Sequence, residues 1–191
     1  MLWRAATCLF PTGHAVIDMD KLSNLPQPAL VYRVRHLIRQ IGGRPYGVSD
    51  AAVSGLYERL LAGRNSTLGG CQFVRSLRRC EPTRFYVVRE LGRKPEILDV
   101  VADDDVIFAG CWRVRTKQAG KLVHVGAYGK LDDVGAPTVW PADNATLPYV
   151  VRRAIPVIIT LDGEVLYPQI DVCGVSDPPT NVVFSAQFLG L

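Results

Sequence analysis

The sequence predicts an α+β fold, in which an N-terminal helical hairpin is followed by antiparallel β hairpins with one short helix. Apolar residues recur at helical spacing over residues 29–41 and again over residues 53–61. After Gly63 the pattern changes to short apolar runs separated by turn residues, which is typical of strands. The dipeptide Asp162-Gly163 lies between two such runs and predicts a β hairpin, because glycine readily takes the positive φ that a two-residue turn demands.

The first elements predicted are two short strands and a helical turn. The strands are residues 8–10 and 15–17, joined by a Pro-Thr-Gly turn. Either Asp18 or Asp20 is expected to cap the helical turn, which ends before Pro26.

Two amphipathic helices come next and are expected to pack against each other. The first ends at Gly42-Gly43, and the second is capped by Ser49-Asp50 and ends at Gly63. Neither helix could bury its apolar stripe alone, so the two should form a hairpin.

The remaining elements are predicted to be strands, with one helix among them. Residues 71–74 and 85–88 are expected to form one hairpin, 111–115 and 122–125 a second, and 157–161 and 165–167 a third. In the second hairpin Trp112 and Val114 should face inward, and Arg113 and Arg115 outward. Further expectations are a polar linker over residues 91–105, a short helix over 146–153 and a last strand near 182–184 that completes the sheet.

Charge divides the chain into two parts. The whole chain has a net charge of +4, but residues 1–95 hold 15 Lys/Arg against 6 Asp/Glu, whereas residues 96–191 hold 7 against 12. We therefore predict two domains: 1–95, a basic helical-hairpin plus β-hairpin RNA-binding region, and 96–191, a mainly antiparallel β domain. Arginine prevails among the basic residues of the first part, and guanidinium groups bind phosphate through paired hydrogen bonds and stack on exposed bases.

The candidate phosphate contacts are eight arginines of the first part, taken as a set. They are Arg33, Arg35, Arg39, Arg64, Arg75, Arg78, Arg79 and Arg84. Each arginine alone is more often a solvated surface residue than a phosphate contact, so the prediction concerns the group.

Catalytic and metal-binding motifs are absent from the sequence. It contains no GxxxxGK[ST], GxGxxG, HExxH or GxSxG pattern, and its five cysteines are scattered without a CxxC pair. No apolar run is long enough for a membrane helix, and no secretory signal begins the chain. We expect a cytoplasmic protein with no metal site, no membrane association and no cofactor of its own.

Two features invite a chemical interpretation that the sequence does not favour. Cys71 follows Gly69-Gly70 and could be a nucleophile with His36 or His124 as base, but a lone cysteine at a strand start is usually a small buried apolar residue. The run 103–105 is three consecutive Asp, which is more typical of a solvated turn than of a metal site.

Several segments together resemble a known family. Residues 41–46 (IGGRPY), the helix after them, residues 66–71 (STLGGC) and residues 88–90 (VRE) resemble the region that follows the catalytic domain in α-proteobacterial tRNA(Ile)-lysidine synthetases. The segment from Leu147 to Pro168 is similar to that family's C-terminal tail, and the resemblance covers roughly residues 5–191.

The chain also departs from the family. Where the family has WDGRF, residues 108–112 read FAGCW, so the Asp and the first Arg are lost. The family's N-terminal ATP-pyrophosphatase domain, with its SGGxDS phosphate loop, is absent from the sequence, and the chain is expected to be either a piece cut at a domain boundary or a truncated gene product.

The resemblance implies a role in tRNA modification. Intact enzymes of this family use ATP, with Mg, to adenylate the wobble cytidine of the CAU-anticodon isoleucine tRNA, and lysine then displaces AMP. That ligase chemistry belongs to the missing domain, and the region resembled here helps to hold the tRNA. The expected function is thus a catalytically inert tRNA-binding accessory region, partnered by tRNA and by the missing ATP-pyrophosphatase domain.

Two other functions stay open. The acidic part could be a protein-interaction module that packs on a catalytic domain or on a second copy, giving a homodimer. The chain could also be a small enzyme that uses Cys71 or Cys111.

Overall fold

The computed structural model has an α+β fold made of helices and antiparallel-rich sheets. It describes residues 6–43, 47–77, 81–92, 96–127, 147–171 and 183–190. The chain divides into two compact units, which are described separately: unit 1 is residues 1–90 with 190–191, and unit 2 is residues 91–189. The sequence had suggested a division between residues 95 and 96.

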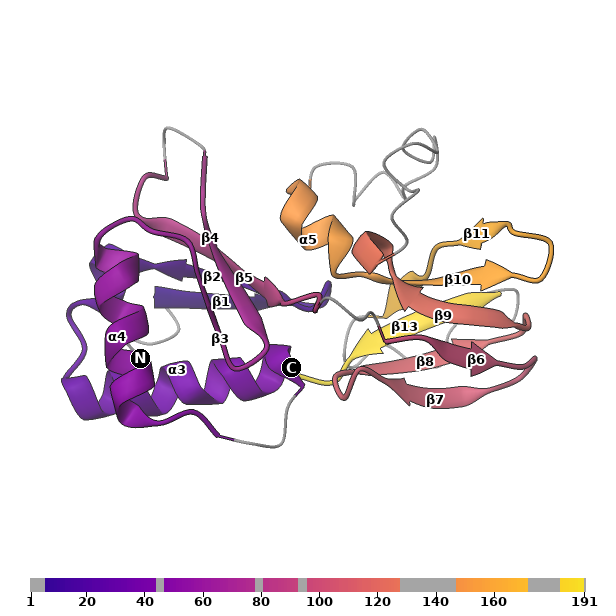
Figure 1. Ribbon diagram of the computed structural model, residues 1–191, viewed down its shortest axis with the longest axis horizontal. Coiled ribbons are helices and arrows are strands. Elements are labelled where there is room, and N and C mark those ends of the chain that lie inside the picture. The colour runs from indigo at the N-terminus through magenta and orange to yellow at the C-terminus, as the bar shows by residue number, and fades with distance from the viewer. Residues whose placement is uncertain are drawn as a thin grey trace. The chain divides into compact units, whose positions relative to one another are not determined.

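Unit 1 consists of one antiparallel sheet with its helices packed on it (Figure 1). Its five strands lie in the order β1-β2-β5-β4-β3. They are β1 (Thr7–Phe10), β2 (His14–Asp18), β3 (Ser66–Leu68), β4 (Cys71–Arg75) and β5 (Arg84–Arg89). The predicted N-terminal strands and the predicted hairpin over 71–88 are confirmed, and they belong to the same sheet.

The helices of unit 1 begin and end where local sequence signals place them. Those within the described residues are α2 (Met19–Leu22), α3 (Gln27–Gly42) and α4 (Asp50–Leu61). The Asp18 carboxylate accepts from the Lys21 N–H and the Ser49 hydroxyl from the Ala52 N–H, so each is an N-cap. Gly43 ends α3 in the left-handed conformation, with φ 61°.

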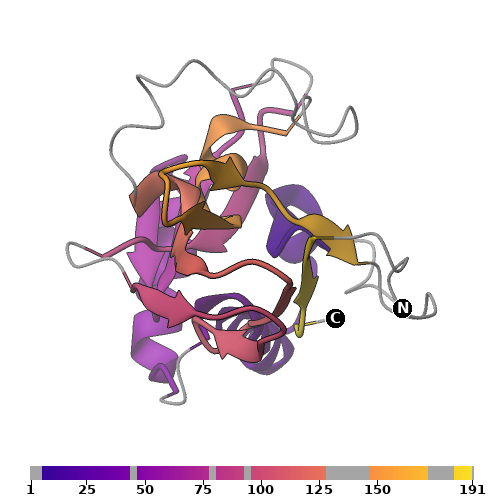
Figure 2. The ribbon, with the colours of Figure 1, turned by 90° about the vertical axis from the view of Figure 1, so that its right-hand side faces the viewer.

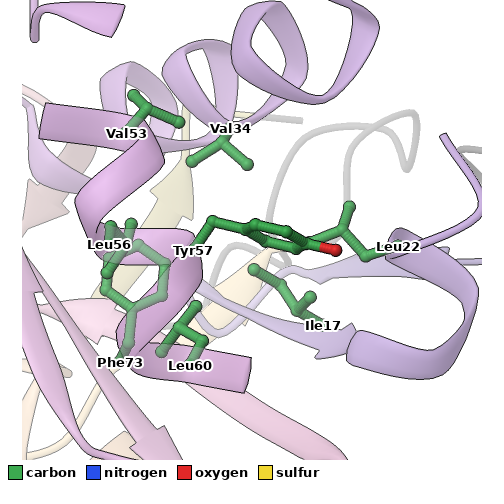
Figure 3. Close-up of a pocket in the computed structure, with 8 residues that line it drawn as sticks. All are labelled: Ile17, Leu22, Val34, Val53, Leu56, Tyr57, Leu60 and Phe73. Carbon is green, nitrogen blue, oxygen red and sulfur yellow. The ribbon is translucent and has the colours of Figure 1, made fainter. Parts of the chain in front are cut away.

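The core of unit 1 lies between the two long helices and one face of the sheet. Every second residue of β4 and β5 points to this face, and those buried there include Phe73, Phe85 and Val87. A small void of about 10 Å³ remains there (Figure 3). Its lining residues are Ile17, Leu22, Val34, Val53, Leu56, Tyr57, Leu60 and Phe73. A void of this size and apolar lining is too small for a ligand and lacks the polar partners that would hold a water.

The described residues of unit 2 form two four-stranded sheets, one short α-helix and one 3-10 turn. One sheet has the order β11-β10-β9-β6 and the other β12-β13-β8-β7. The strands are β6 (Leu98–Val100), β7 (Asp105–Phe108), β8 (Trp112–Thr116), β9 (Gly120–His124), β10 (Pro156–Thr160), β11 (Val165–Leu166), β12 (Gln169–Asp171) and β13 (Phe184–Phe188). The helical elements are η1 (Val125–Ala127) and α5 (Tyr149–Arg153).

Aromatic side chains fill the core of unit 2. The Trp112 and Phe188 rings meet edge to face on neighbouring strands, 5.4 Å apart. The Phe108 ring lies 4.7 Å from the His124 ring and joins the two sheets. Figure 2 looks onto unit 2 and shows the strands of both of its sheets.

Three sequence predictions about unit 2 are confirmed. The strands flanking Asp162-Gly163 pair as a hairpin, and Gly163 has φ 87°. The short helix α5 begins directly after Pro148, as expected, and ends at Arg153. Thr146, the first residue of the predicted range, lies outside the described residues. Along β8, Trp112 and Val114 are buried while Arg113 and Arg115 are more exposed.

The predicted hairpin of residues 111–115 and 122–125 is wrong. The two strands, β8 and β9, are consecutive but belong to different sheets. β8 pairs with β7 and β13, and β9 pairs with β6 and β10. Between them the Thr116 hydroxyl is hydrogen-bonded to the backbone of Gln118, and the chain passes from one sheet to the other. Alternation showed which faces are buried, but it holds no information on which strands are neighbours.

Two further expectations need correction. Residues 91–105 are not simply a linker, because they include β6 and the first residue of β7. The last strand spans residues 184–188 instead of 182–184, and it pairs in parallel with β12, so the sheet is not wholly antiparallel. β6 pairs with β9 and β13 pairs with β8, both of which are distant in sequence, and a short strand gains its stability from such a partner.

Candidate nucleic-acid interface

The three predicted arginines of α3 do not share one surface. At 100° per residue Arg35 and Arg39 lie on one flank of the buried stripe and Arg33 on the other. The Arg35 Nε–H donates to the Val48 carbonyl at 2.7 Å, and its Nη2 lies 2.6 Å from the Asp50 carboxylate. Arg35 is therefore neutralised locally, whereas Arg39 meets no carboxylate among the described residues. The Arg33 guanidinium lies 5.9 Å from the Tyr32 ring.

Of the four predicted arginines in the β4–β5 hairpin, the structure describes two. The Arg84 guanidinium is 2.6 Å from the Glu81 carboxylate and 3.9 Å from that of Asp18, so its charge is balanced. The Arg75 Nε–H instead donates to a neutral acceptor, the Pro82 carbonyl, at 3.0 Å. Arg78 and Arg79 lie outside the described residues.

Three arginines gather around the loop that joins α4 to β3, and we call them the α4–β3 cluster: Arg59, Arg64 and Arg75. The Arg59 Nε–H donates to the Ser66 hydroxyl at 2.8 Å. The Arg75 side chain passes close to Gly63, and its backbone N–H donates to the Asn65 side-chain carbonyl at 2.8 Å. Arg64 lies between these contacts in sequence and is exposed.

The α4–β3 cluster concentrates positive charge that no carboxylate of the described residues neutralises. Its guanidinium contacts are a hydroxyl and a backbone carbonyl, and within the described ranges none of its three arginines forms an ion pair. Neutral acceptors fix the direction of a guanidinium but leave its charge intact, so an anion such as a phosphate can still bind it.

The backbone of the loop fixes where these charges lie. Gly63 has φ 69°, its N–H donates to the Leu60 carbonyl, and the Arg64 N–H donates to the Arg59 carbonyl. This is a left-handed helix end, which turns the chain sharply from α4 into β3. Arg59 and Arg64 therefore lie on the two sides of one tight turn.

Sequence reasoning missed Arg59 as a member of this group. The signal was available: Arg59 lies in the last turn of α4, off its apolar stripe, four residues before the glycine that ends the helix. Gly63 marks the end of the helix in the sequence, but the boundary alone does not show which side chains the left-handed turn brings beside Arg64.

The glycines at the end of α3 and in the β3–β4 turn form a packing junction between these two elements. Gly69 and Gly70 are the two turn residues between β3 and β4, with φ 60° and 82°. A Cβ on Gly42, the last residue of α3, would lie less than 3.0 Å from the Gly69 carbonyl oxygen. The turn is therefore docked directly on the end of α3, where only glycine leaves room for it.

Hydrogen bonds of Cys71, Arg89 and Glu90 complete the junction between the β3–β4 turn and α3. The Cys71 thiol donates to the Ile38 carbonyl at 3.5 Å, and Cys71 is fully buried. The Arg89 guanidinium donates to the Gly42 carbonyl at 2.8 Å, and the Glu90 N–H to the Gly70 carbonyl at the same distance. A thiol with no solvent access is poorly placed for nucleophilic attack on a substrate, and Cys111 is buried as well.

Residues 108–112, where this sequence differs from the family resembled, include a turn with a left-handed backbone. Ala109 has φ 57° and forms the β7–β8 turn together with Gly110, which has φ 69°. Asp adopts this left-handed region more readily than Ala. An Asp at this position, as in the family resembled, would therefore suit the turn irrespective of any contact with RNA.

Acidic side chains of the described residues make turn and ion-pair contacts. The described residues include no group of three or more His, Cys, Asp or Glu that could hold a metal ion. Of the Asp run, Asp104 caps the Val101 N–H and Asp105 pairs with Arg113 and Arg115, as in a turn and the strand after it. None of the described helices has the length and hydropathy needed to cross a bilayer.

Comparison with known proteins adds no assignment: neither a protein-family model nor a curated protein sequence matches this chain.

Proposed function

We propose that the chain is a tRNA-binding accessory region, catalytically inert by itself, whose unit 1 holds the RNA backbone. The observation that carries this proposal is the α4–β3 cluster, three arginines beside one turn, of which Arg59 and Arg75 donate to neutral acceptors and Arg64 is exposed. Phosphate contacts of this kind supply affinity and position the RNA without reading its sequence. The excess of basic residues over residues 1–95 supports the same conclusion.

The finer part of the proposal comes from the family resembled. We propose that the chain serves a tRNA(Ile)-lysidine synthetase in the cytoplasm, and that ATP, Mg and lysine bind to a separate ATP-pyrophosphatase domain. The residues that carry the resemblance form the junction of Gly42, Gly69, Cys71 and Arg89, so they support a shared architecture. The arginines support the binding of RNA.

The proposal predicts that the chain binds tRNA with an affinity that depends on salt. The double variant Arg59→Gln and Arg64→Gln should lower both the affinity and its salt dependence. Each phosphate that an arginine neutralises releases counterions, so the double variant should reduce the slope of log K against log[salt] by about 2. Its affinity for tRNA at low salt should fall about tenfold or more. Filter binding of the full chain to unfractionated tRNA over a salt series measures both quantities.

The matched control is Lys121→Gln combined with Arg115→Gln, which removes the same charge from unit 2. Lys121 faces Asp99 at 3.1 Å and Arg115 faces Asp105 at 3.3 Å, so both cations are already paired. The control variant should keep the wild-type slope. Equal losses in the two double variants would mean that binding only follows net charge, and would contradict a specific role for the cluster.

The competing function, a protein-interaction module, makes a different prediction. It requires that the wild-type chain bind no tRNA even at low ionic strength. It also requires a dimer, or a complex with a catalytic domain added in trans, when the chain is examined by size exclusion with light scattering. Wild-type tRNA binding that weakens steeply with salt contradicts this alternative.

A further inference from the structure

Unit 2 carries an exposed aromatic side chain flanked by two arginines. Tyr149 is the first residue of α5 and is 50% exposed. The guanidinium carbons of Arg152 and Arg153 lie 5.9 Å and 5.6 Å from the centre of its ring. Residues three and four positions apart on a helix are neighbours on its surface, so α5 itself brings these three side chains together.

Among the described residues, neither of the two arginines faces a carboxylate. The Arg153 Nη2–H donates to the Gly126 carbonyl at 3.3 Å, which ties α5 to η1. The Arg152 Nε–H is buried and meets no acceptor in the part of the chain that the structure describes. By contrast, Arg113, Arg115 and Lys121 on the same unit each face a carboxylate.

The position of this trio is fixed by the fold. Pro148 precedes the helix, Val151 is fully buried, and Ile155 continues from the helix into β10 as another buried residue. The apolar side of α5 is therefore anchored in unit 2 while Tyr149 projects from it. A Tyr ring has few rotatable bonds, so presenting it costs little conformational entropy when a ligand binds.

Base stacking is the chemistry that this arrangement fits. A half-exposed aromatic ring offers a surface on which an unpaired nucleobase can stack, and adjacent guanidiniums can bind the phosphates on either side of that base. A duplex buries its bases in its own stack and offers no free base face. A protein partner of acidic character would use the charges but would not require the aromatic ring.

We propose that Tyr149, Arg152 and Arg153 form a platform for one unpaired nucleobase of the bound RNA. This proposal rests on the proposed function, because the RNA is the one held by the α4–β3 cluster. It adds the substrate class: RNA with a single-stranded or looped segment. Asp and Glu outnumber Lys and Arg in unit 2, so its contribution to binding is local and depends on stacking.

The test compares Tyr149→Ala with Tyr149→Phe in the full chain. The probe is a fluorescein-labelled single-stranded RNA 12-mer, measured by fluorescence anisotropy, together with the same RNA annealed to its complement. Tyr149→Ala should weaken binding of the single strand about tenfold, whereas Tyr149→Phe, which keeps the ring, should bind like the wild type. Neither variant should change the affinity for the duplex.

Thermal unfolding of both variants should match the wild type, because Tyr149 is half exposed. If Tyr149→Ala unfolds early, Tyr149→Leu, which keeps the bulk but not the aromatic ring, takes its place and is expected to give the same selective loss. Equal binding by Tyr149→Ala and Tyr149→Phe, or an equal loss on single strand and duplex, overturns the platform. Either result leaves the proposed function intact if the wild type still binds tRNA in a salt-dependent way. Absence of tRNA binding by the wild type overturns the proposed function instead.

Discussion

Replacing Gly42 with alanine is expected to destabilise unit 1 by about 2–3 kcal/mol, because the added methyl group has no space. Its Cβ would lie less than 3.0 Å from the Gly69 carbonyl oxygen, and close to the Cys71 sulfur at 3.3 Å. A backbone oxygen cannot turn away as the end of a flexible side chain can. The β3–β4 turn would therefore have to move off the end of α3, and the Arg89 contact to the Gly42 carbonyl would weaken with it.

Gly55→Ala provides the matched control, because Gly55 is also a helical glycine of unit 1. A Cβ at Gly55 would meet its nearest neighbour, the Arg59 Nη1, at 3.5 Å, which is ordinary van der Waals contact. Alanine is the better helix former, so Gly55→Ala should stabilise the unit by roughly 0.5–1 kcal/mol. The two substitutions are thus expected to have opposite signs.

Urea denaturation followed by circular dichroism measures both changes, and hydrogen exchange of the α3 amides assigns the affected transition to unit 1. If Gly42→Ala is as stable as the wild type, the junction between the β3–β4 turn and α3 is not as tight as described here. The salt dependence of RNA binding is a separate readout, and it should be retained wherever Gly42→Ala remains folded.

Acidification from pH 6.5 to pH 4 is expected to remove about 3 kcal/mol of stability through His14 alone. Burial lowers the pKa of His14 from 6.5 to about 4, since the ring lies stacked on Phe10 at 4.5 Å and is only 3% exposed. Its Nδ1 is hydrogen-bonded to the Thr12 hydroxyl at 2.7 Å. The folded state therefore favours the neutral ring.

The direction of the pH effect follows from proton binding. Between pH 6.5 and pH 4 the unfolded chain takes up a proton on His14 that the folded chain does not, so lowering the pH favours unfolding. The contribution of His14 is fully present above pH 6.5 and is lost as the pH falls to about 4. Arg113 lowers the pKa of Asp105, so the pairing of that carboxylate is lost only at still lower pH.

The comparison of His14→Gln with His36→Gln isolates this effect. Free energies of unfolding from urea titrations at intervals between pH 7.5 and pH 4 should fall steeply for the wild type and for His36→Gln, whose histidine is exposed on α3. The profile of His14→Gln should be much flatter over the same interval. A wild-type profile that is flat from pH 6.5 to pH 4 would contradict the burial of His14.

The parts of the fold that the sequence predicted are those encoded within one short window. The boundaries of α3 and α4 follow from a local apolar period and from caps such as Ser49 and Gly43. The hairpin at Asp162-Gly163 follows from a dipeptide with a specific backbone requirement. The separation of β8 from β9 could not be predicted in this way, because it depends on which of several similar strands pair across long stretches of chain.

The candidate interface was predictable in composition but not in detail. A surplus of arginine over residues 1–95 is visible in the sequence, and the pairing of Arg84 with Glu81, three residues away, could have been anticipated. The pairing of Arg35 with Asp50 required the hairpin of α3 and α4 to be built first. The same holds for Arg59, which meets Ser66 only after the chain has turned at Gly63.

The docking of the β3–β4 turn on the end of α3 affects how relatives of this chain should be sought. A search pattern assembled from Gly42, Gly69 and Gly70 selects for a steric requirement, so it would retrieve chains that share the scaffold whether or not they contact nucleic acid. A pattern that requires basic side chains on both sides of the turn after α4 would instead select for the proposed binding of a polyanion. The two criteria can diverge during evolution, because one constrains backbone clearance and the other constrains surface charge.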